Sequence, residues 1–167
     1  MSNPVPLQYN AVYHVYNRGN NGEDLFIEER NYGYFMQLYI HHVHPVVETY
    51  AYCLLRNHFH LLIKIKSEKE VPKSPSRHFA NLFSAYAKAI NKAYDRTGSL
   101  SERPFQRIQV TDDAYFAQLV TYIHLNPVQH GFVVDPREWP YSSYDALRST
   151  KPTRLRRDVV LDWFGGK

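Results

Sequence analysis

Residues 46–66 read VVETYAYCLLRNHFHLLIKIK, two runs of β-branched, aromatic and aliphatic residues with almost nothing between them. Such residues favour strands, and so short a break favours a tight hairpin. In a strand, residues two apart project from the same face of the sheet. His58 and His60 are therefore expected side by side, with Phe59 pointing the other way into a core. Two imidazoles so placed can converge on one divalent ion, although two ordinary surface histidines on a half-buried strand give the same pattern.

The segments around this hairpin alternate between strand and helix patterns. In chain order they are a strand at about 8–17, a short strand near 25–27, a helix that Pro45 ends, an amphipathic helix over 77–97 with Gly98 just past its end, and a strand over 104–111. The main order, strand–helix–strand–strand–helix–strand, predicts an α+β, ferredoxin-like (split βαβ) antiparallel sheet with helices on one face. His58 and His60 then lie on a central strand, where unpaired polar groups are costly, so the pair needs an explanation.

One further helix is expected after the last strand, over about 112–127. Aspartates at its start suit an N-cap, and Pro127 is expected to end it. Tyr122 and Asn126 are four residues apart and therefore share a face of this helix, whereas His124 points elsewhere. The helix after the fourth strand is thus predicted to carry a second group of polar residues on one face, Tyr122 and Asn126.

The chain has the length and composition of one domain. Its 167 residues, 44% of them hydrophobic, predict a core over about 8–147, a short Ser-capped helix near its end and a basic tail over 148–167. Twenty Lys and Arg against 16 Asp and Glu give a net charge of +4, which permits a nucleic-acid partner without requiring one. The single cysteine, Cys53, excludes an intrachain disulfide and a Cys-based zinc site. Because no signal-peptide pattern and no long apolar run occur, we expect a cytoplasmic protein with no membrane partner.

Several spaced motifs resemble one family when they are taken in order. They are YHVYNRGNN at 13–21, CLLRNHFHLLIKI at 53–65, GSLSERPFQRIQV at 98–110, YIHLNPVQHGFV at 122–133 and WPYSSY at 139–144. Over about residues 11–147 the chain resembles the IS200-like single-tyrosine transposases with a His-hydrophobe-His (HUH) motif, in particular the branch of REP-associated tyrosine transposases. An HxH pair alone is a weak signal, but an HxH pair followed well downstream by YIHLNPV is specific.

The resemblance implies a metal-dependent transesterase acting on single-stranded DNA. His58 and His60 match the family's metal motif, Asn126 matches a third ligand, and Tyr122 matches the nucleophile. With Mg²⁺ or Mn²⁺, this family cuts one strand near a DNA hairpin, links the tyrosine to the 5′ phosphate, releases a 3′ hydroxyl and rejoins strands. The residues suit this chemistry, because a phenol is a poor nucleophile unaided and neutral ligands leave a bound cation its full charge. Arg56 and Ser101 depart from the family's pattern without removing a catalytic residue.

Arginines at the end of the first strand, beside the fourth strand and in the C-terminal tail are candidate DNA contacts, since phosphate binding supplies much of the affinity for nucleic acids. The predicted set is Arg18, Arg103, Arg107, Arg154, Arg156 and Arg157. Arg18, Arg103 and Arg107 are equally interpretable as solvated surface arginines, whereas the other three form a denser basic patch that favours DNA binding more but lies further from the expected chemistry. A further histidine group at 41, 42 and 44 completes no metal site and is interpreted as a helix end.

Two alternatives stay open beside the transposase interpretation. One is a metal-dependent nuclease that uses water as its nucleophile, and the other is a domesticated DNA- or RNA-hairpin-binding protein that does not cut. We expect a bacterial protein, associated with the nucleoid when it acts on single-stranded DNA with hairpins. A homodimer and a monomer are equally compatible with the sequence, because the IS200 branch implies dimers and the REP-associated branch suggests monomers.

Overall fold

The structure, a computed structural model, describes residues 5–164 and has one four-stranded antiparallel sheet. Its strands are β1 (Val12–Arg18), β2 (Val47–Leu55), β3 (His58–Ile65) and β4 (Gln106–Val110). Their order across the sheet is β2-β3-β1-β4, so the strand that carries the two histidines is an interior strand, as predicted. The predicted α+β antiparallel architecture is confirmed.

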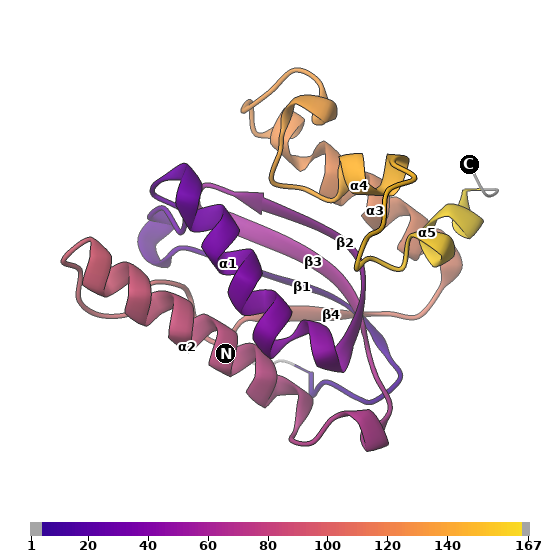
Figure 1. The fold of residues 1–167 in the computed structure, drawn as a ribbon, viewed down its shortest axis with the longest axis horizontal. Coiled ribbons are helices and arrows are strands. Elements are labelled where there is room, and N and C mark those ends of the chain that lie inside the picture. Colours follow the sequence, from indigo (N-terminus) through magenta and orange to yellow (C-terminus); the bar gives the residue numbers. More distant parts are fainter. Residues whose placement is uncertain (1–4, 165–167) are drawn as a thin grey trace.

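Two long helices, α1 (Glu29–His42) and α2 (Pro75–Ala93), cover one face of the sheet, where they cross in front of it in Figure 1. The core on this side contains Phe59 of β3 at 2% exposure, together with Tyr13 and Val15 of β1. Since Phe59 is buried here, the alternation along β3 turns His58 and His60 to the opposite face. The predicted orientation of this strand is confirmed.

The other face is covered by α3 (Asp113–Gln129), with α4 (Tyr144–Arg148) and α5 (Arg157–Trp163) packed beside it (Figure 1). A second core lies there, in which Leu62 of β3 meets Phe116 and Ile123 of α3. Four single turns of 3-10 helix complete the described chain, at Asn20–Gly22, His44–Val46, Glu68–Glu70 and Pro136–Glu138. The helix predicted after the fourth strand thus lies on the face that bears the histidines.

Three local expectations are wrong. No strand forms at 25–27, because the backbone N–H groups of Leu25 and Phe26 both donate to one acceptor, the carbonyl of Arg56 in the β2–β3 turn, at 2.7 and 3.0 Å. The helix α3 runs past Pro127 and ends two residues later, at Gln129, so the proline does not end the helix. The helix α2 ends at Ala93, so a further turn separates it from Gly98.

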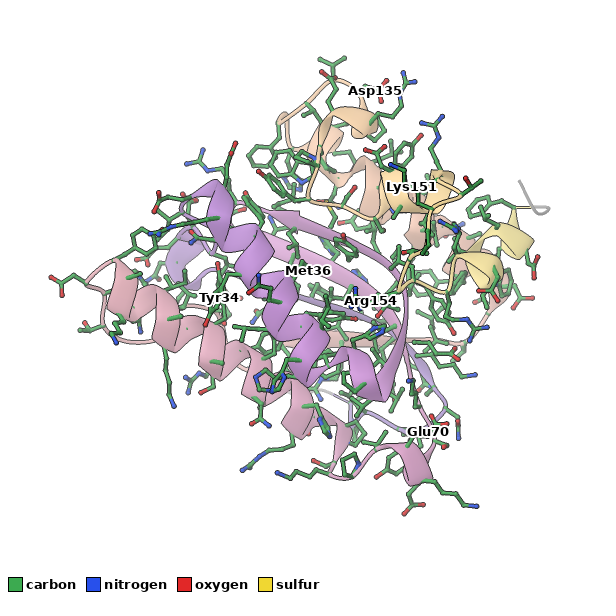
Figure 2. The ribbon with its side chains drawn as sticks, in the orientation of Figure 1. Tyr34, Met36, Glu70, Asp135, Lys151 and Arg154 are labelled. Carbon is green, nitrogen blue, oxygen red and sulfur yellow. The ribbon has the colours of Figure 1, made fainter. Side chains whose placement is uncertain are left out.

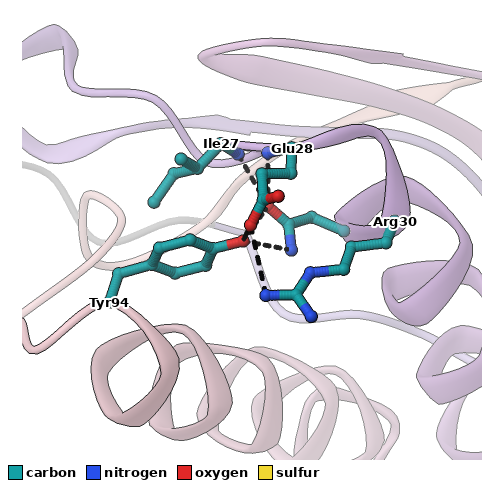
Figure 3. A network of polar contacts seen from close by, with 5 residues as sticks. Ile27, Glu28, Arg30 and Tyr94 are labelled. Carbon is teal, nitrogen blue, oxygen red and sulfur yellow. Dashed lines mark hydrogen bonds and ion pairs between the residues drawn. The ribbon is translucent and has the colours of Figure 1, made fainter.

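The start of α1 is held by a polar network that reaches the residue following α2 (Figure 3). Asn31 accepts hydrogen bonds from the backbone N–H groups of Ile27 and Glu28 at 2.8 and 2.7 Å, which caps the helix. The hydroxyl of Tyr94, just past α2, donates to the carboxylate of Glu28 and lowers its pKa. This network ties the two helices of the first core together at one end.

The segment after α3 runs along the outer edge of β2. Backbone hydrogen bonds join it to the strand at three places: from Leu54 to Tyr141 at 2.8 Å, from Ser143 to Tyr52 at 2.9 Å, and from Arg156 to Thr49 at 2.8 Å. An edge strand with unpaired backbone groups is a template for wrong pairing, and this segment covers it. Part of the predicted basic tail over 148–167 therefore belongs to the folded domain, because Arg156 is bonded to β2.

Candidate active site

A cleft of about 530 Å³ opens where α3 meets the ends of β1 and β3. Its walls are formed by Tyr16, Asn17, Arg18, Asn57, His58, Phe59, His60, Glu102, Gln106, Tyr122 and His130. Histidines, amides and tyrosines dominate this lining, and its single carboxylate, Glu102, is paired with Arg18 at 2.9 Å. The cleft is therefore a polar site without a free acidic group among the residues that line it.

Three of the four residues singled out from sequence, His58, His60 and Tyr122, line this cleft, and the fourth, Asn126, is buried against His58. His58 and His60 come from β3, with their rings 5.4 Å apart between centroids. Tyr122 and Asn126 come from successive turns of α3, and the ring of Tyr122 lies 5.5 Å from that of His60. Asn126 is fully buried with its Oδ1 3.1 Å from His58 Nε2, whereas Tyr122 is 41% exposed and accessible to a substrate.

Hydrogen bonding around His58 leaves a place for a cation. Its Nδ1 lies 2.8 Å from Oδ1 of Asn57, and its Nε2 faces Oδ1 of Asn126. Both partners are acceptors, but a neutral imidazole carries one N–H, and burial lowers the pKa of His58 and disfavours the doubly protonated ring. When Nδ1 donates to Asn57, two lone pairs face each other at 3.1 Å. Neighbouring ligands of an octahedral ion with bonds of about 2.1 Å are about 3.0 Å apart, so the two atoms are spaced as two neighbouring ligands of one cation would be.

The orientation of the Asn126 amide is also compatible with its oxygen acting as a ligand beside His58. Its Nδ2 points to the carbonyl of Tyr122 one turn earlier, at 3.5 Å, so its oxygen is turned toward His58. Within residues 5–164, no three His, Cys, Asp or Glu side chains are grouped as a metal site. The donors that this cleft offers are two imidazoles and an amide oxygen.

His14 is a member of the site that the sequence did not single out. It lies on β1 directly beside β3, and its Nε2 is 2.9 Å from Nδ1 of His60. Burial lowers the pKa of His14 to about 4 and, with the help of neighbouring histidines, the pKa of His60 to about 3. Both rings are therefore neutral at pH 7. Because Nδ1 of His60 is engaged, its Nε2 is the nitrogen left for a ligand, which is how a supporting partner fixes a metal-binding histidine.

His130 is the second residue that sequence reasoning missed. It caps the C-terminal end of α3, and its ring lies 4.7 Å from that of His58 in the cleft wall. It follows Asn126 by four residues, about one helical turn, which places it on the same side of the helix as Asn126. This spacing could have predicted His130 at the site, but the helix was expected to end at Pro127, before His130.

The six arginines predicted to bind DNA are not gathered in one place. Arg18 alone among them lines the cleft. Arg107 pairs in register with Val15, whose side chain faces the first core, and its guanidinium stacks 3.9 Å from the ring centroid of Phe105. Arg103 is exposed beside the cleft residue Glu102.

The three C-terminal arginines lie away from the cleft. Arg154 lines a separate cavity of about 250 Å³ that Met36 of α1 also lines (Figure 2). Arg156 pairs with Glu48 at 2.5 Å and with Asp158 at 3.1 Å, and Arg157 donates to the carbonyl of Ala146 at 2.9 Å. The role of these residues in DNA binding stays a prediction.

Comparisons with known proteins agree with the fold and with the motifs. No family model matches the chain. A protein of Haemophilus influenzae named as a REP-associated tyrosine transposase is 29% identical over 110 residues, which are 60% of this chain and 61% of that protein. The chain thus spans less than two thirds of the length of this relative. The resemblance in sequence that the motifs predict is confirmed.

The solved structure of the REP-associated tyrosine transposase bound to a REP hairpin superposes with a TM-score of 0.70 at 16% identity, over 91% of this chain and 88% of that one. This match shows that the two chains share a fold. A bacterial tRNA(His) guanylyltransferase-like protein in complex with ATP superposes with a TM-score of only 0.44, too low to imply a common fold. Among the helices described for residues 5–164, none is long and apolar enough to cross a membrane.

Proposed function

We propose that this chain is a metal-dependent single-strand DNA transesterase of the transposase type, with Tyr122 as its nucleophile. One observation carries the proposal: an accessible tyrosine and two neutral histidines line a single cleft, and a buried asparagine oxygen contacts one of these histidines. The similarity to REP-associated tyrosine transposases in sequence and in fold supports it. His58, His60 and Asn126 are the proposed ligands of Mg²⁺ or Mn²⁺.

In this mechanism the hydroxyl oxygen of Tyr122 attacks a backbone phosphorus. The bond from Tyr122 to phosphorus forms, the bond from phosphorus to the 3′ oxygen breaks, the phenol loses its proton and the 3′ oxygen gains one. A bound divalent cation supplies positive charge to the phosphate oxygens. His14 holds His60 in the ring orientation that presents Nε2. The attack by Tyr122 leaves a 5′-phosphotyrosine ester, which stores the bond energy for rejoining the strands without ATP.

The proposed substrate is single-stranded DNA next to a hairpin. The related structure was solved with a REP hairpin, and the cleft of this chain is open and has a cation, Arg18, at its wall. Hairpin stems present phosphates to surface arginines, and the unpaired strand is the part that can enter a cleft of this size. The proposal holds for a monomer and for a homodimer.

The experiment is a denaturation-stable adduct assay with single strands drawn from hairpin sequences that flank the gene. The strand is labelled at its 3′ end, because the 5′-phosphotyrosine retains the downstream fragment. Labelled protein is expected with Mn²⁺ and not with EDTA, and it should disappear in Tyr122→Phe. Tyr115→Phe on the same helix, outside the cleft, is the matched control and should behave as the wild type.

The same assay separates the alternatives. Cleavage without labelled protein would indicate that water is the nucleophile and would refute the role of Tyr122. Hairpin binding with neither cleavage nor adduct would indicate a binding protein. An adduct that persists in Tyr122→Phe would assign the nucleophile to another tyrosine.

A further inference from the structure

Behind the cleft, a buried histidine connects α3 to the segment that covers β2. His124, 6% exposed, lies between Tyr122 and Asn126 in sequence but projects from another side of the helix. Its Nε2 is 2.7 Å from Oγ of Ser143, which is fully buried. Neither residue lines the cleft, so this contact has no direct part in binding a substrate.

Ser143 is itself fixed to the sheet by both backbone groups of Tyr52 on β2. The Ser143 N–H donates to the Tyr52 carbonyl at 2.9 Å, and the Tyr52 N–H donates to Ser143 Oγ at 2.8 Å. The hydroxyl also lies 3.2 Å from the Tyr52 carbonyl, to which it donates. With His124 donating its Nε2–H to Oγ, every one of these donors and acceptors is satisfied.

This arrangement also explains why Ser143 does not cap α4. Ser143 occupies the N-cap position, where the sequence predicts a capping serine, but its side chain makes no capping hydrogen bond. The hydroxyl is used between β2 and α3 instead. Ser143 thus gives up a capping hydrogen bond, worth about 1 kcal/mol in many helices, and instead bonds to β2 and α3, which are distant in sequence.

Apolar contacts alone do not fix how a helix is turned about its axis. The residues of α3 in the second core, such as Leu119 and Ile123, hold the helix against the sheet through apolar contacts, which are not directional. A hydrogen bond is directional, and one from a buried side chain to a group fixed on the sheet sets both rotation and position along the axis. The residues whose placement depends on that setting are the ones that face the cleft.

We propose that His124 and Ser143 are positioning residues, which fix α3 against β2 and thereby hold Tyr122 and Asn126 in register with His58 and His60. The structural part of this proposal concerns the free protein. Its catalytic consequence rests on the proposed function. The chain therefore uses a segment far along the sequence to set the geometry of its cleft.

The test compares Ser143→Ala with Ser142→Ala, a neighbouring buried serine whose hydroxyl accepts from the backbone N–H of Tyr144 at 3.2 Å. Side-chain NMR signals of His58 and Tyr122 are recorded in the metal-free protein labelled at histidine and tyrosine, beside the melting temperature. Ser143→Ala is expected to shift or broaden these signals while the protein stays folded, and Ser142→Ala is expected to leave them unchanged. Unchanged His58 and Tyr122 signals in folded Ser143→Ala, or equal changes in both variants, would overturn the proposal.

A second pair of variants covers the case in which Ser143→Ala does not fold. His124→Gln places an amide N–H near the former Nε2 and should keep the wild-type signals, whereas His124→Leu keeps the packing but should shift or broaden them. Equal spectra for these two variants would also overturn the proposal. None of these measurements needs DNA or metal, so they test the positioning role of His124 and Ser143 even if the wild-type protein does not cut DNA.

The catalytic consequence is measured separately, in single-turnover cleavage of a hairpin substrate. Ser143→Ala is expected to lower the cleavage rate about tenfold or more, by analogy with the loss of supporting partners at metal sites, with hairpin affinity within about twofold of wild type. A variant whose hairpin affinity falls as far as its cleavage rate would point to a merely structural role and contradict the proposal.

Discussion

At the scale of single residues, the cleft depends on which nitrogen of each histidine is free. His60 has Nδ1 engaged by His14, and His58 has Nδ1 engaged by Asn57, so both rings present Nε2 in the same region. Asn126 adds an oxygen whose direction is set by its own helix. The proposed donor set is thus already arranged in the free protein, so binding of a cation would impose little further ordering.

Loss of the partner of His60 should weaken metal binding without removing a ligand. We expect His14→Phe to lower the affinity for Mn²⁺ about 10- to 100-fold, as for other supporting partners, because His60 loses the contact that holds its ring. Titration calorimetry on metal-stripped protein measures this. The exposed His41→Ala is the control, and an unchanged affinity in folded His14→Phe would show that His14 does not support the site.

The only cysteine should be unreactive in the folded protein. Cys53 is fully buried on β2, and burial raises the pKa of its thiol to about 12, so almost no thiolate exists at pH 7 to 8. We expect no reaction with a thiol-specific disulfide reagent under native conditions and one equivalent in denaturant. Rapid reaction of the native protein would show that the β2 face opens readily.

At the scale of elements, α3 combines two functions. One side packs in the second core, Tyr122 lines the cleft, and Asn126 one turn later contacts His58. Its N-terminal end is fixed by Asp112, which accepts from the N–H of Tyr115 at 2.8 Å, as the sequence predicted. The side chain of His124 holds a third side of the helix. A helix held on several sides can keep a nucleophile in place while its hydroxyl stays exposed.

Packing of α3 should account for much of its placement. Ile123→Ala, at a fully buried position, is expected to lower the free energy of unfolding by about 2–5 kcal/mol through lost burial and the cavity left behind. Leu125→Ala on the same helix, 36% exposed, should change it by about 0.5 kcal/mol or less. Urea denaturation of both variants provides the comparison. Similar losses for the two would contradict the packing described for α3.

At the scale of the whole molecule, one sheet separates two hydrophobic cores, and only the α3 side borders the cleft. The α1–α2 side is a closed layer that contains the aromatic residues around Phe59, and the α3 side holds the cleft. The C-terminal segment completes the second side by covering β2, with Arg156 paired to Glu48 across that edge. The overall charge of +4 favours approach of DNA without selecting a site for it.

Electrostatic contact with DNA should therefore differ among the arginines. Arg18→Gln at the cleft is expected to weaken hairpin binding and to reduce the slope of log affinity against log salt by about 1, because one phosphate contact is lost. Arg137, paired with Asp135 far along the chain, provides the control Arg137→Gln. Fluorescence anisotropy over a salt series measures both, and an unchanged slope for Arg18→Gln would remove it from the interface.

The sequence predicts the sheet and the core of the candidate site because both follow from short-range periodicity. Alternation on β3 faces Phe59 to one core and His58 to the other side, and helical spacing brings Tyr122 and Asn126 to one face. His14 escaped notice because its contact with His60 depends on the register between two strands far apart in sequence. Ser143 escaped because its local role as a cap was the obvious one, and its tertiary role depends on where the last segment lies.

The most direct test of the account is to identify the residue that carries DNA after reaction. The wild-type protein is incubated with a hairpin-bearing single strand and Mn²⁺, digested with protease and nuclease, and its peptides are analysed by mass spectrometry. We predict a nucleotide 5′-phosphate ester on Tyr122 and on none of the other tyrosines. Modification of a different tyrosine, or efficient cleavage with every tyrosine unmodified, would contradict the central claim.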